Sequence, residues 1–440
     1  MSLQVSSASV SAASGSAAQK RQAYLAQLLA QRPASATGEL QAIRDRALTL
    51  IQEQELPGPK AEDWRFTDLS PLYAIEFQAA PAATLTPDQL EAIAWSGLEP
   101  RIVFVNGRFE SQLSQLQSLP AGVSFASIAD LSAEALTAIG QHPGAGEVFT
   151  ALNAATFLDV AVLKVARNQV PEEPIHLLFV TTAGAQPHMS VPRVLVQVET
   201  GAVATLIEDY VTVGTGQTFT NAVTEVAIAA NAELRHTRIQ RESPEAFHLG
   251  KTTVTQARDS RYRAVNLSVG GQISRHTPEV TTLDGQTETV LDGLTLAVAS
   301  QLADTHSTLT FSAPHCTANQ LHKCIVDDAA RAVFNGKVFV PQVAQQTDAA
   351  QLSRNLLLSP KARVDTKPQL EIVADDVKCA HGATVSQLEE DEVFYLQSRG
   401  LDRENACDLL VKAFAAEILQ KCPVDSIRQG LLRQILAQVR

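Results

Sequence analysis

The stretch RVLVQVETGAVATLIEDYV, residues 193–211, decides the fold class of this chain. Two runs rich in Val, Leu, Ile and Thr flank a Glu-Thr-Gly break, which is the pattern of two short strands joined by a turn. The same texture continues from about residue 156 to residue 384, where we expect strands of about five residues, one roughly every 8–12 residues. No segment of this range has convincing helical periodicity, so the sequence predicts an all-β core.

The connections between these runs bear on which all-β architecture forms. Sandwiches, barrels and solenoids all contain short strands at regular spacing. The run of strands is long for one sandwich, and few two-residue hairpin turns separate its members. Stacked coils of a parallel β-helix, each burying its apolar face on the next, fit these features best.

The residues before the core, 1–155, predict a helical and mixed region. Apolar side chains recur at helical spacing, and LPGPK at residues 56–60 is a hard stop between elements. The predicted elements are helices over residues 20–31, 39–53 and 86–95, followed by a hairpin in RIVFVNGRF that turns at Asn106-Gly107.

The residues after the core, 385–440, predict a helical domain. Ser386 and Glu389 have the spacing of a capping box, Gly400 sits where a helix C-cap belongs, and Asp402 can cap the next helix. Two apolar stripes predict helices that pack on a neighbour. They consist of Ala406, Leu409, Leu410, Ala413, Phe414 and Ile418, and of Ile427, Leu431, Leu432, Ile435 and Val439. A short helical domain on a long β-structure is suited to docking another protein.

Composition excludes several classes of partner. The 440 residues are 45% apolar and 19% charged, the profile of a soluble globular protein with a large core. The net charge is −12 and no long basic block occurs, so neither nucleic acid nor an anionic membrane surface is an expected partner. No apolar run approaches the roughly 18 residues that span a bilayer. Five cysteines without regular spacing do not form a disulfide framework, which favours a reducing compartment such as the cytoplasm.

The first 38 residues contain no Asp or Glu and are rich in Ser and Ala. A disordered tail that leads into a helix is the interpretation we favour, and a plastid transit peptide is the alternative. The expected location is therefore the cytoplasm, or a plastid if this segment is a transit peptide.

The stretch DDVKCAHGAT, residues 375–384, contains the first candidate site. The preceding KPQLEIVADDV predicts a strand. If the strand extends to His381, its period of two places Cys379 and His381 on one face, roughly 6.6 Å apart at Cα. Lys378 then points away, which weakens the case for an activated nucleophile. A thiolate and an imidazole on one face suit iron or zinc, but they make only half a site. A buried Cys beside a hydrogen-bonded His is the alternative.

A second group of N and S donors lies in PHCTANQLHKC and consists of His315, Cys316, His322 and Cys324. Their H-C and H-x-C pairs do not have the spacing of a zinc site. We therefore expect core cysteines and surface histidines in this segment.

A nucleotide-binding interpretation of HLGKTT, residues 248–253, is rejected. The segment ends like a phosphate-binding loop, but the position that requires the first glycine is Glu245, and no helix pattern follows.

Scattered acids leave a polysaccharide-cleaving β-helix enzyme as a rival interpretation. Such an enzyme needs a carboxylate pair, and the candidates are Asp284, Glu288, Asp292 and Asp304. Two of them precede a glycine, which is more typical of turns.

Two segments carry a resemblance to a known family. KAEDWRFTDLSPL, residues 60–72, and the segment from Phe334 to Leu401, which contains VDTKPQLEIVADDVKCAHGATVSQ, resemble the SufB/SufD family of iron–sulfur cluster assembly proteins. The likeness is most specific over residues 331–440 and is closest to the SufD branch. SufB-like sequences carry a cysteine where this chain has Thr347, and the motif after the last strand here is CAHGAT rather than the His-Glu-Ala type.

The resemblance implies a fold, partners and a cargo. The fold is a right-handed parallel β-helix core flanked by an N-terminal helical region and a C-terminal helical domain. The function is that of a non-catalytic scaffold, which pairs with a SufB-like paralogue through β-helix edges near residues 340–384 and binds a SufC-like ABC ATPase. The nascent iron–sulfur cluster is shared with the paralogue, and none is tightly bound to the isolated chain.

The resemblance also implies site residues. His381 matches the family histidine that joins a cysteine of the SufB-like partner in holding the nascent cluster, and Cys379 is a second candidate. Contacts with the ATPase are expected at Phe394, Tyr395, Leu396, Arg399, Gly400, Leu409, Leu410 and Phe414. A stand-alone metal-binding homodimer that uses the Cys-His groups is a further rival.

Overall fold

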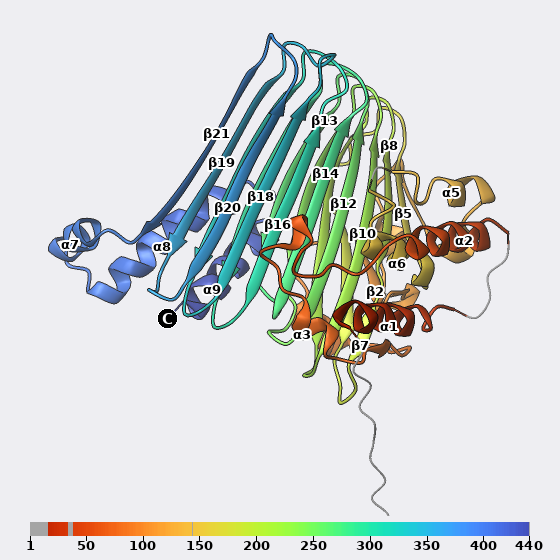
Figure 1. Ribbon diagram of the computed structural model, residues 1–440, viewed down its shortest axis with the longest axis horizontal. Coiled ribbons are helices and arrows are strands. Elements are labelled where there is room, and N and C mark those ends of the chain that lie inside the picture. The colour runs from red at the N-terminus through yellow and green to blue at the C-terminus, as the bar shows by residue number, and fades with distance from the viewer. Residues whose placement is uncertain (1–15, 34–37, 143, 440) are drawn as a thin grey trace, which may run out of the picture.

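Strands dominate the chain from Ala161 to Gln387, where they wind into a β-solenoid (Figure 1). The computed structural model describes residues 16–33, 38–142 and 144–439. The solenoid strands are β5 (Ala161–Val165), β6 (Ile175–Thr182), β7 (His188–Ser190), β8 (Arg193–Val198), β9 (Val203–Val213), β10 (Thr218–Ile228), β11 (Glu233–Gln240), β12 (Phe247–Gln256), β13 (Arg261–Ser268), β14 (Ile273–Thr282), β15 (Glu288–Ala297), β16 (Leu302–Thr310), β17 (Thr317–Val326), β18 (Arg331–Val340), β19 (Asp348–Leu357), β20 (Arg363–Ile372) and β21 (Lys378–Gln387).

Most successive strands alternate between two sheets that enclose the core. Sheet A contains β20-β18-β16-β14-β12-β10-β8-β5 in that order, and sheet B contains β21-β19-β17-β15-β13-β11-β9-β6. Neighbouring strands in both runs are parallel and stack coil upon coil. The main apolar core fills the space between the two sheets. This topology confirms the predicted β-solenoid.

The strands are longer than predicted. From β9 onward each has eight to eleven residues rather than about five. The prediction failed because polar residues inside strands resembled turns. Thr224 and Glu225 interrupt the apolar run of β10, yet both are buried, and the Thr224 hydroxyl donates a hydrogen bond to Glu208 Oε1 at 2.9 Å. Since a buried polar group costs little once it is hydrogen-bonded, the solenoid accommodates polar residues within its strands.

Most N-terminal helices cover the outer face of sheet A, while the segment around Leu90 packs on sheet B, and the region also closes the first coil (Figure 1). Its elements are α1 (Ala17–Leu29), α2 (Gly38–Gln52), α3 (Ser70–Tyr73), β1 (Gln78–Ala79), α4 (Pro87–Ile93), β2 (Arg101–Val105), β3 (Arg108–Phe109), β4 (Val123–Ala126), α5 (Ala133–Thr137) and α6 (Val148–Thr156). Side chains of α2, such as Ile43 and Ala47, pack in one cluster with Phe219 and Phe247 of sheet A. β2 extends sheet B at β6, and β4 extends sheet A at β5. The predicted helices and the Asn106-Gly107 hairpin are confirmed, with φ angles of 52° and 74° in the turn.

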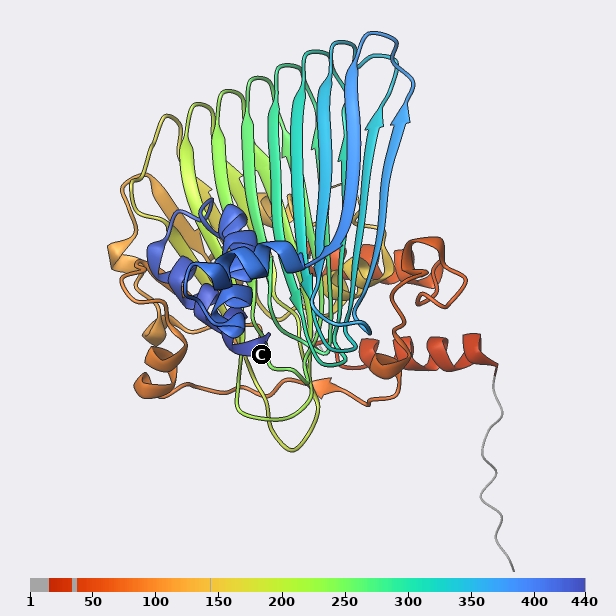
Figure 2. The same cartoon turned by 90° about the vertical axis from the view of Figure 1, so that its left-hand side faces the viewer.

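The C-terminal helices pack on the outer face of sheet B, on the opposite side from α1, α2 and α6 (Figure 2). They are α7 (Glu390–Ser398), α8 (Arg403–Leu419) and α9 (Asp425–Gln438). Asp402 caps α8 as predicted, since its side chain accepts the Asn405 N–H at 2.8 Å. The predicted capping box is wrong because Ser386 belongs to β21, whose ladder extends to Gln387, and Glu389 makes no side-chain cap.

The buried stripes of the last two helices follow the prediction in part. On α9, Ile427, Leu431 and Ile435 are fully buried. On α8 the buried residues are Ala406, Val411, Ala415, Ile418 and Leu419. Leu409, predicted within the stripe, is 42% exposed because α8 turns a different face toward the solenoid.

Two sequence-based expectations concern the chain as a whole. The expected N-terminal tail falls largely on residues 1–15 and 34–37, which lie outside the described residues. In the part of the chain that the structure describes, no helix has both the length and the apolar character needed to cross a bilayer.

Candidate functional site

The two ends of the solenoid differ. At the first coil, β2 and β4 continue the sheets, whereas β20 and β21 at the last coil pair on one side only, with β18 and β19. Among the described residues no strand pairs with their outer edges. We call β20 and β21 the open coil. Ile372, Val373 and Val385 are 41%, 55% and 51% exposed there. Unpaired strand edges with apolar side chains are a template for pairing with another chain.

The open coil contains both residues of the first candidate site. Cys379 lies beside Ala349 of β19, and His381 lies beside Gln351. Ala349 and Gln351 are buried, and Cys379 packs against the core between the sheets. Because strand side chains alternate, His381 also belongs to the inner face, yet it is exposed since no further coil covers it. The upstream strand ends at Ile372 and a turn separates it from β21, so Cys379 and His381 share a face of a separate strand rather than of the upstream one.

The thiol of Cys379 is not activated by its surroundings. Burial raises its pKa, with a smaller contribution from the nearby Asp348 carboxylate. A hydrogen bond from the Ala349 backbone opposes this shift and does not reverse it. A nucleophilic cysteine needs the opposite environment, in which cations or a helix N-terminus lower the pKa. The structure therefore gives no support to Cys379 as an activated nucleophile.

The second group of donors does not form one site. His315 is exposed on a turn, with φ at 61°, while Cys316 is buried and its thiol donates to Ala313 O at 3.3 Å. His322 and Cys324 lie inside the solenoid. The expectation of a surface histidine is thus wrong for His322, because β17 turns alternate residues inward. No group of three or more His, Cys, Asp or Glu suited to a metal occurs among the residues that the structure describes.

Burial shifts the pKa values of His322 and Cys324. The Nε2 atom of His322 is 3.1 Å from Thr295 Oγ1, and its ring stacks on Phe334 with the ring centroids 4.7 Å apart. Burial lowers its pKa to about 3, so the imidazole is neutral at pH 7. Burial raises the pKa of the Cys324 thiol to about 12. Neither group carries charge in the folded state at neutral pH.

We expect His322 to make stability fall in acid. Its folded pKa lies below its unfolded value of about 6.5, so its contribution is complete above that pH and is lost as the pH falls toward 3. Between pH 7 and pH 5 the free energy of unfolding should decrease by about 2 kcal/mol through this group. Urea unfolding across this range should show a shallower decrease for His322→Gln. The same substitution at the exposed His315 serves as control, and an equal change in slope from both variants would contradict this assignment.

The four scattered acids do not assemble into a carboxylate pair. Asp284 accepts the Gly285 N–H of its turn at 2.7 Å, and Glu288 pairs with Arg263 at 2.6 Å. Asp292 pairs with Lys421 of the C-terminal region. Asp304 lies on the other sheet and bonds Thr67 and Arg275. HLGKTT is part of β12 rather than a loop. These contacts support neither a polysaccharide-cleaving site at the four acids nor a phosphate-binding loop at HLGKTT.

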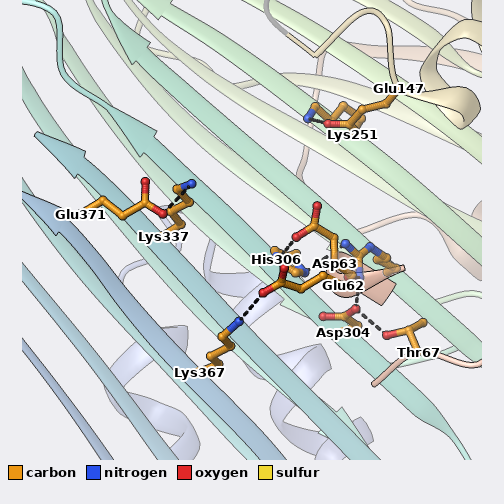
Figure 3. A network of polar contacts seen from close by, with 11 residues as sticks. Glu62, Asp63, Thr67, Glu147, Lys251, Asp304, His306, Lys337, Lys367 and Glu371 are labelled. Atoms are coloured by element: carbon orange, nitrogen blue, oxygen red, sulfur yellow. Dashed lines mark hydrogen bonds and ion pairs between the residues drawn. The ribbon is translucent and has the colours of Figure 1, made fainter. Parts of the chain in front are cut away.

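A groove of about 550 Å³ lies on the outer face of sheet A and was not predicted (Figure 3). The strap, which we define as residues 54–67, forms one wall. Arg275 donates to Asp63 O at 2.9 Å and lies 4.0 Å from the Trp64 ring centroid. Glu62 pairs with Lys367 of β20 at 3.2 Å. The only sequence signal was the EDWRF motif within the strap.

The basic side chains that line the groove form ion pairs with carboxylates of the same chain. Lys251 pairs with Glu147 at 2.6 Å and also with Glu279, and Lys337 pairs with Glu371 at 2.9 Å. Arg275 pairs with Asp304. Each of these cations thus has a carboxylate partner from this chain. The strap itself is held on sheet A by Arg275, by the Glu62–Lys367 pair and by the Thr67 hydroxyl, which donates to Asp304 Oδ2 at 2.6 Å.

The C-terminal helices expose part of the predicted docking set. Phe394 and Tyr395 on α7 are 71% and 62% exposed, and Leu409 on α8 joins them at 42%. Arg399 and Gly400 are exposed, and Leu396 and Leu410 are half-buried. Phe414 instead lies against sheet B, where its ring centroid is 4.0 Å from Lys323 Nζ. The structure thus leaves five of the predicted residues exposed on or near α7 and α8 and turns Phe414 toward the solenoid.

Known proteins resemble this chain over most of its length. A family model described as the SufBD core domain of SUF system FeS cluster assembly matches residues 179–414, and the SufBD N-terminal region model matches residues 22–177. An iron–sulfur cluster assembly SufBD family protein of Synechocystis sp. is 44% identical over 407 residues, 90% of each chain. Protein ABCI7, chloroplastic, of Arabidopsis thaliana is 35% identical over 88% of this chain and 84% of its own. The SufD protein of Escherichia coli K12 is 35% identical over 87% and 88%. The chain therefore belongs to the SufBD family of iron–sulfur cluster assembly proteins of the SUF system.

Proposed function

We propose that this chain is a SufD-like, non-catalytic scaffold subunit of an iron–sulfur cluster assembly complex. Similarity to SufD of Escherichia coli over most of both chains supports this choice within the family. So does Thr347, which stands where SufB-like sequences carry a cysteine. Thr347 is buried and its hydroxyl donates to Ala344 O at 2.8 Å, so this position stabilises a turn. A chain without that thiol depends on a partner to supply it.

The open coil is the surface that we assign to a SufB-like paralogue. Its two unpaired edges and its exposed Ile372, Val373 and Val385 would be covered by a solenoid of similar dimensions. When the chain is alone, the same surface is available to a second copy, and the dimer formed in this way is the alternative to the heteromeric pair.

The exposed imidazole of His381 on the inner face of the open coil is the observation that carries the proposal. The nascent cluster is the substrate of the complex, and a neutral imidazole is a suitable ligand for its iron. Cys379, half-buried two residues away, is the weaker candidate because deprotonation of its thiol is disfavoured. With half of a ligand set, the isolated chain holds no cluster tightly.

The helices α7 and α8 are the surface that we assign to a SufC-like ABC ATPase, which supplies the ATP hydrolysis. A nucleotide-dependent movement of this partner would bias the position of the C-terminal helices and, through them, the open coil. We place the complex in the cytoplasm, or in a plastid if the N-terminal segment is a transit peptide. The chloroplast protein among the relatives supports the second location.

His381→Ala tests the proposal directly. Cluster formation on the reconstituted complex, followed by absorbance in the visible region, should fall at least about tenfold because one ligand of the shared site is lost. Assembly of the complex, measured by gel filtration, should be unchanged because His381 is not needed for edge pairing. His315→Ala, which removes an exposed histidine on the turn before β17, two strands away from β21 in sheet B, is the matched control. Undiminished cluster formation would remove His381 from the mechanism.

A further inference from the structure

Gln351 is the buried neighbour of His381 on the adjacent strand. The two residues are partners in the β19–β21 register, so their Cα atoms lie about 4.8 Å apart and their side chains share the inner face. Gln351 is 3% exposed, whereas His381 is exposed at the open end. The pair therefore stands at the boundary between the closed interior and the proposed interface.

Hydrogen bonds from deeper in the solenoid hold the Gln351 carboxamide. Its Nε2 donates to Gln320 Oε1 at 2.8 Å, and Gln320 Nε2 donates in turn to Ser307 Oγ on the facing sheet at 2.8 Å. A Cβ at Gly336 of the facing strand β18 would collide with this amide, so the glycine leaves the space that Gln351 fills. With the Gln351 amide nitrogen bonded to Gln320, the Gln351 oxygen is the atom that faces away from this network.

The atom that faces away is an acceptor without a partner. Gln351 Oε1 is buried and has no hydrogen bond to the described residues. Its neighbours on the inner face of β19 cannot supply one, because Ala349 has no side-chain donor and the Ser353 hydroxyl bonds with Asn355. His381 is the side chain with an N–H in register with it on β21. A buried acceptor left unpaired is costly, so this oxygen favours a donor from His381.

We propose that Gln351 is a positioning residue for His381, in a proposal that rests on the function proposed above. Its oxygen, unpaired in this structure, accepts the N–H of one imidazole nitrogen when the exposed His381 side chain turns toward it, and thereby fixes a single tautomer and ring orientation. The lone pair of the other nitrogen is then directed out of the open coil, toward iron held jointly with the partner. Ligand histidines in metal sites commonly have such an acceptor on the second nitrogen. No charge is placed inside the solenoid, since a carboxamide serves in place of a carboxylate.

Nitrogen-15 NMR of the histidine side chains in the full chain tests this proposal without any cluster. At about pH 8.5, where imidazoles are generally neutral, the His381 resonances are assigned by their disappearance in His381→Ala. We expect one protonated and one unprotonated nitrogen in the parent chain. In Gln351→Met, which keeps the volume and removes the acceptor, the two resonances should move toward a common average because both tautomers are populated.

A matched control separates positioning from a general loss of packing. Gln256→Met removes another buried interior glutamine, one that bonds Thr289 and lies several coils away, and it should leave the His381 resonances unchanged. Averaged resonances in the parent chain would overturn the proposal whatever the variants do, and so would a single tautomer that persists in Gln351→Met.

The reconstituted complex provides the second readout. Gln351→Met should weaken retention of the nascent cluster by about 10- to 100-fold, the usual effect of losing the acceptor behind a ligand histidine. If His381→Ala leaves cluster formation intact, the proposed function fails, while the NMR result still decides whether Gln351 positions His381. If only the tautomer measurement fails, His381 keeps its role and Gln351 loses its own.

Discussion

Phe394→Asp combined with Tyr395→Asp should weaken binding of the partner ATPase by about 100-fold or more. Both side chains project from α7, at 71% and 62% exposure, and Leu409 of α8 is 42% exposed. Exposed aromatic side chains of this kind provide most of the binding energy when an interface covers them. Each carboxylate would be desolvated without a cation in the complex, which adds a penalty to the lost apolar contact. Isothermal titration calorimetry of the chain against the isolated ATPase gives the dissociation constants.

Folding of the variant is not at risk, because neither side chain belongs to the core that holds the C-terminal helices on sheet B. Val170→Asp is the matched control, since Val170 is 61% exposed and lies in the loop between β5 and β6 at the other end of the solenoid. Unaltered affinity in the double variant would place the ATPase elsewhere. A loss of affinity in Val170→Asp of the same size would point to a nonspecific effect of added charge.

Arg193→Met should lower the free energy of unfolding by about 3–5 kcal/mol, the range for breaking a buried ion pair from one side. Arg193 is buried beneath α6 on the outer face of sheet A, where it pairs with Glu225 and donates to Asn153 Oδ1 at 3.1 Å. Burial lowers its pKa to about 9, which still leaves it charged at pH 7. Glu225 also accepts the Gly140 N–H at 2.9 Å. Without Arg193, the Glu225 carboxylate stays buried with no guanidinium to compensate it.

Urea denaturation measures this effect, and two further variants define its origin. Arg193→Met combined with Glu225→Met should recover much of the loss, because no uncompensated charge remains. Arg235→Met removes the exposed partner of Glu233 and should cost under about 1 kcal/mol. If Arg193→Met and Arg235→Met cost the same, burial of the pair is not the cause.

The sequence predicted the candidate site only in outline. The spacing of Cys379 and His381 showed that they could share a strand face, and the family resemblance singled out His381. The sequence could not show that this strand face points inward at the open coil, because the direction of the face depends on the strand with which β21 pairs. No sequence pattern singled out Gln351, because a glutamine between alanines and Ser353 resembles a solvent-exposed strand residue. Only the structure shows that Gln320 and Gly336 surround it.

Local pattern by itself determined the order of the three regions, the β character of the core, the Asn106-Gly107 turn and the Asp402 cap. Each of these depends on backbone preferences or on hydrogen bonds between residues a few positions apart. Only the tertiary structure decided the strand lengths, the burial of His322, the exposed face of α8 and the difference between the closed first coil and the open last coil. These features depend on contacts between residues about 30 or more positions apart in the chain, such as Arg193 with Glu225 and Glu62 with Lys367. The burial of a polar side chain is decided by the coil stacked on it, and that coil lies too far along the chain for a local pattern to reveal.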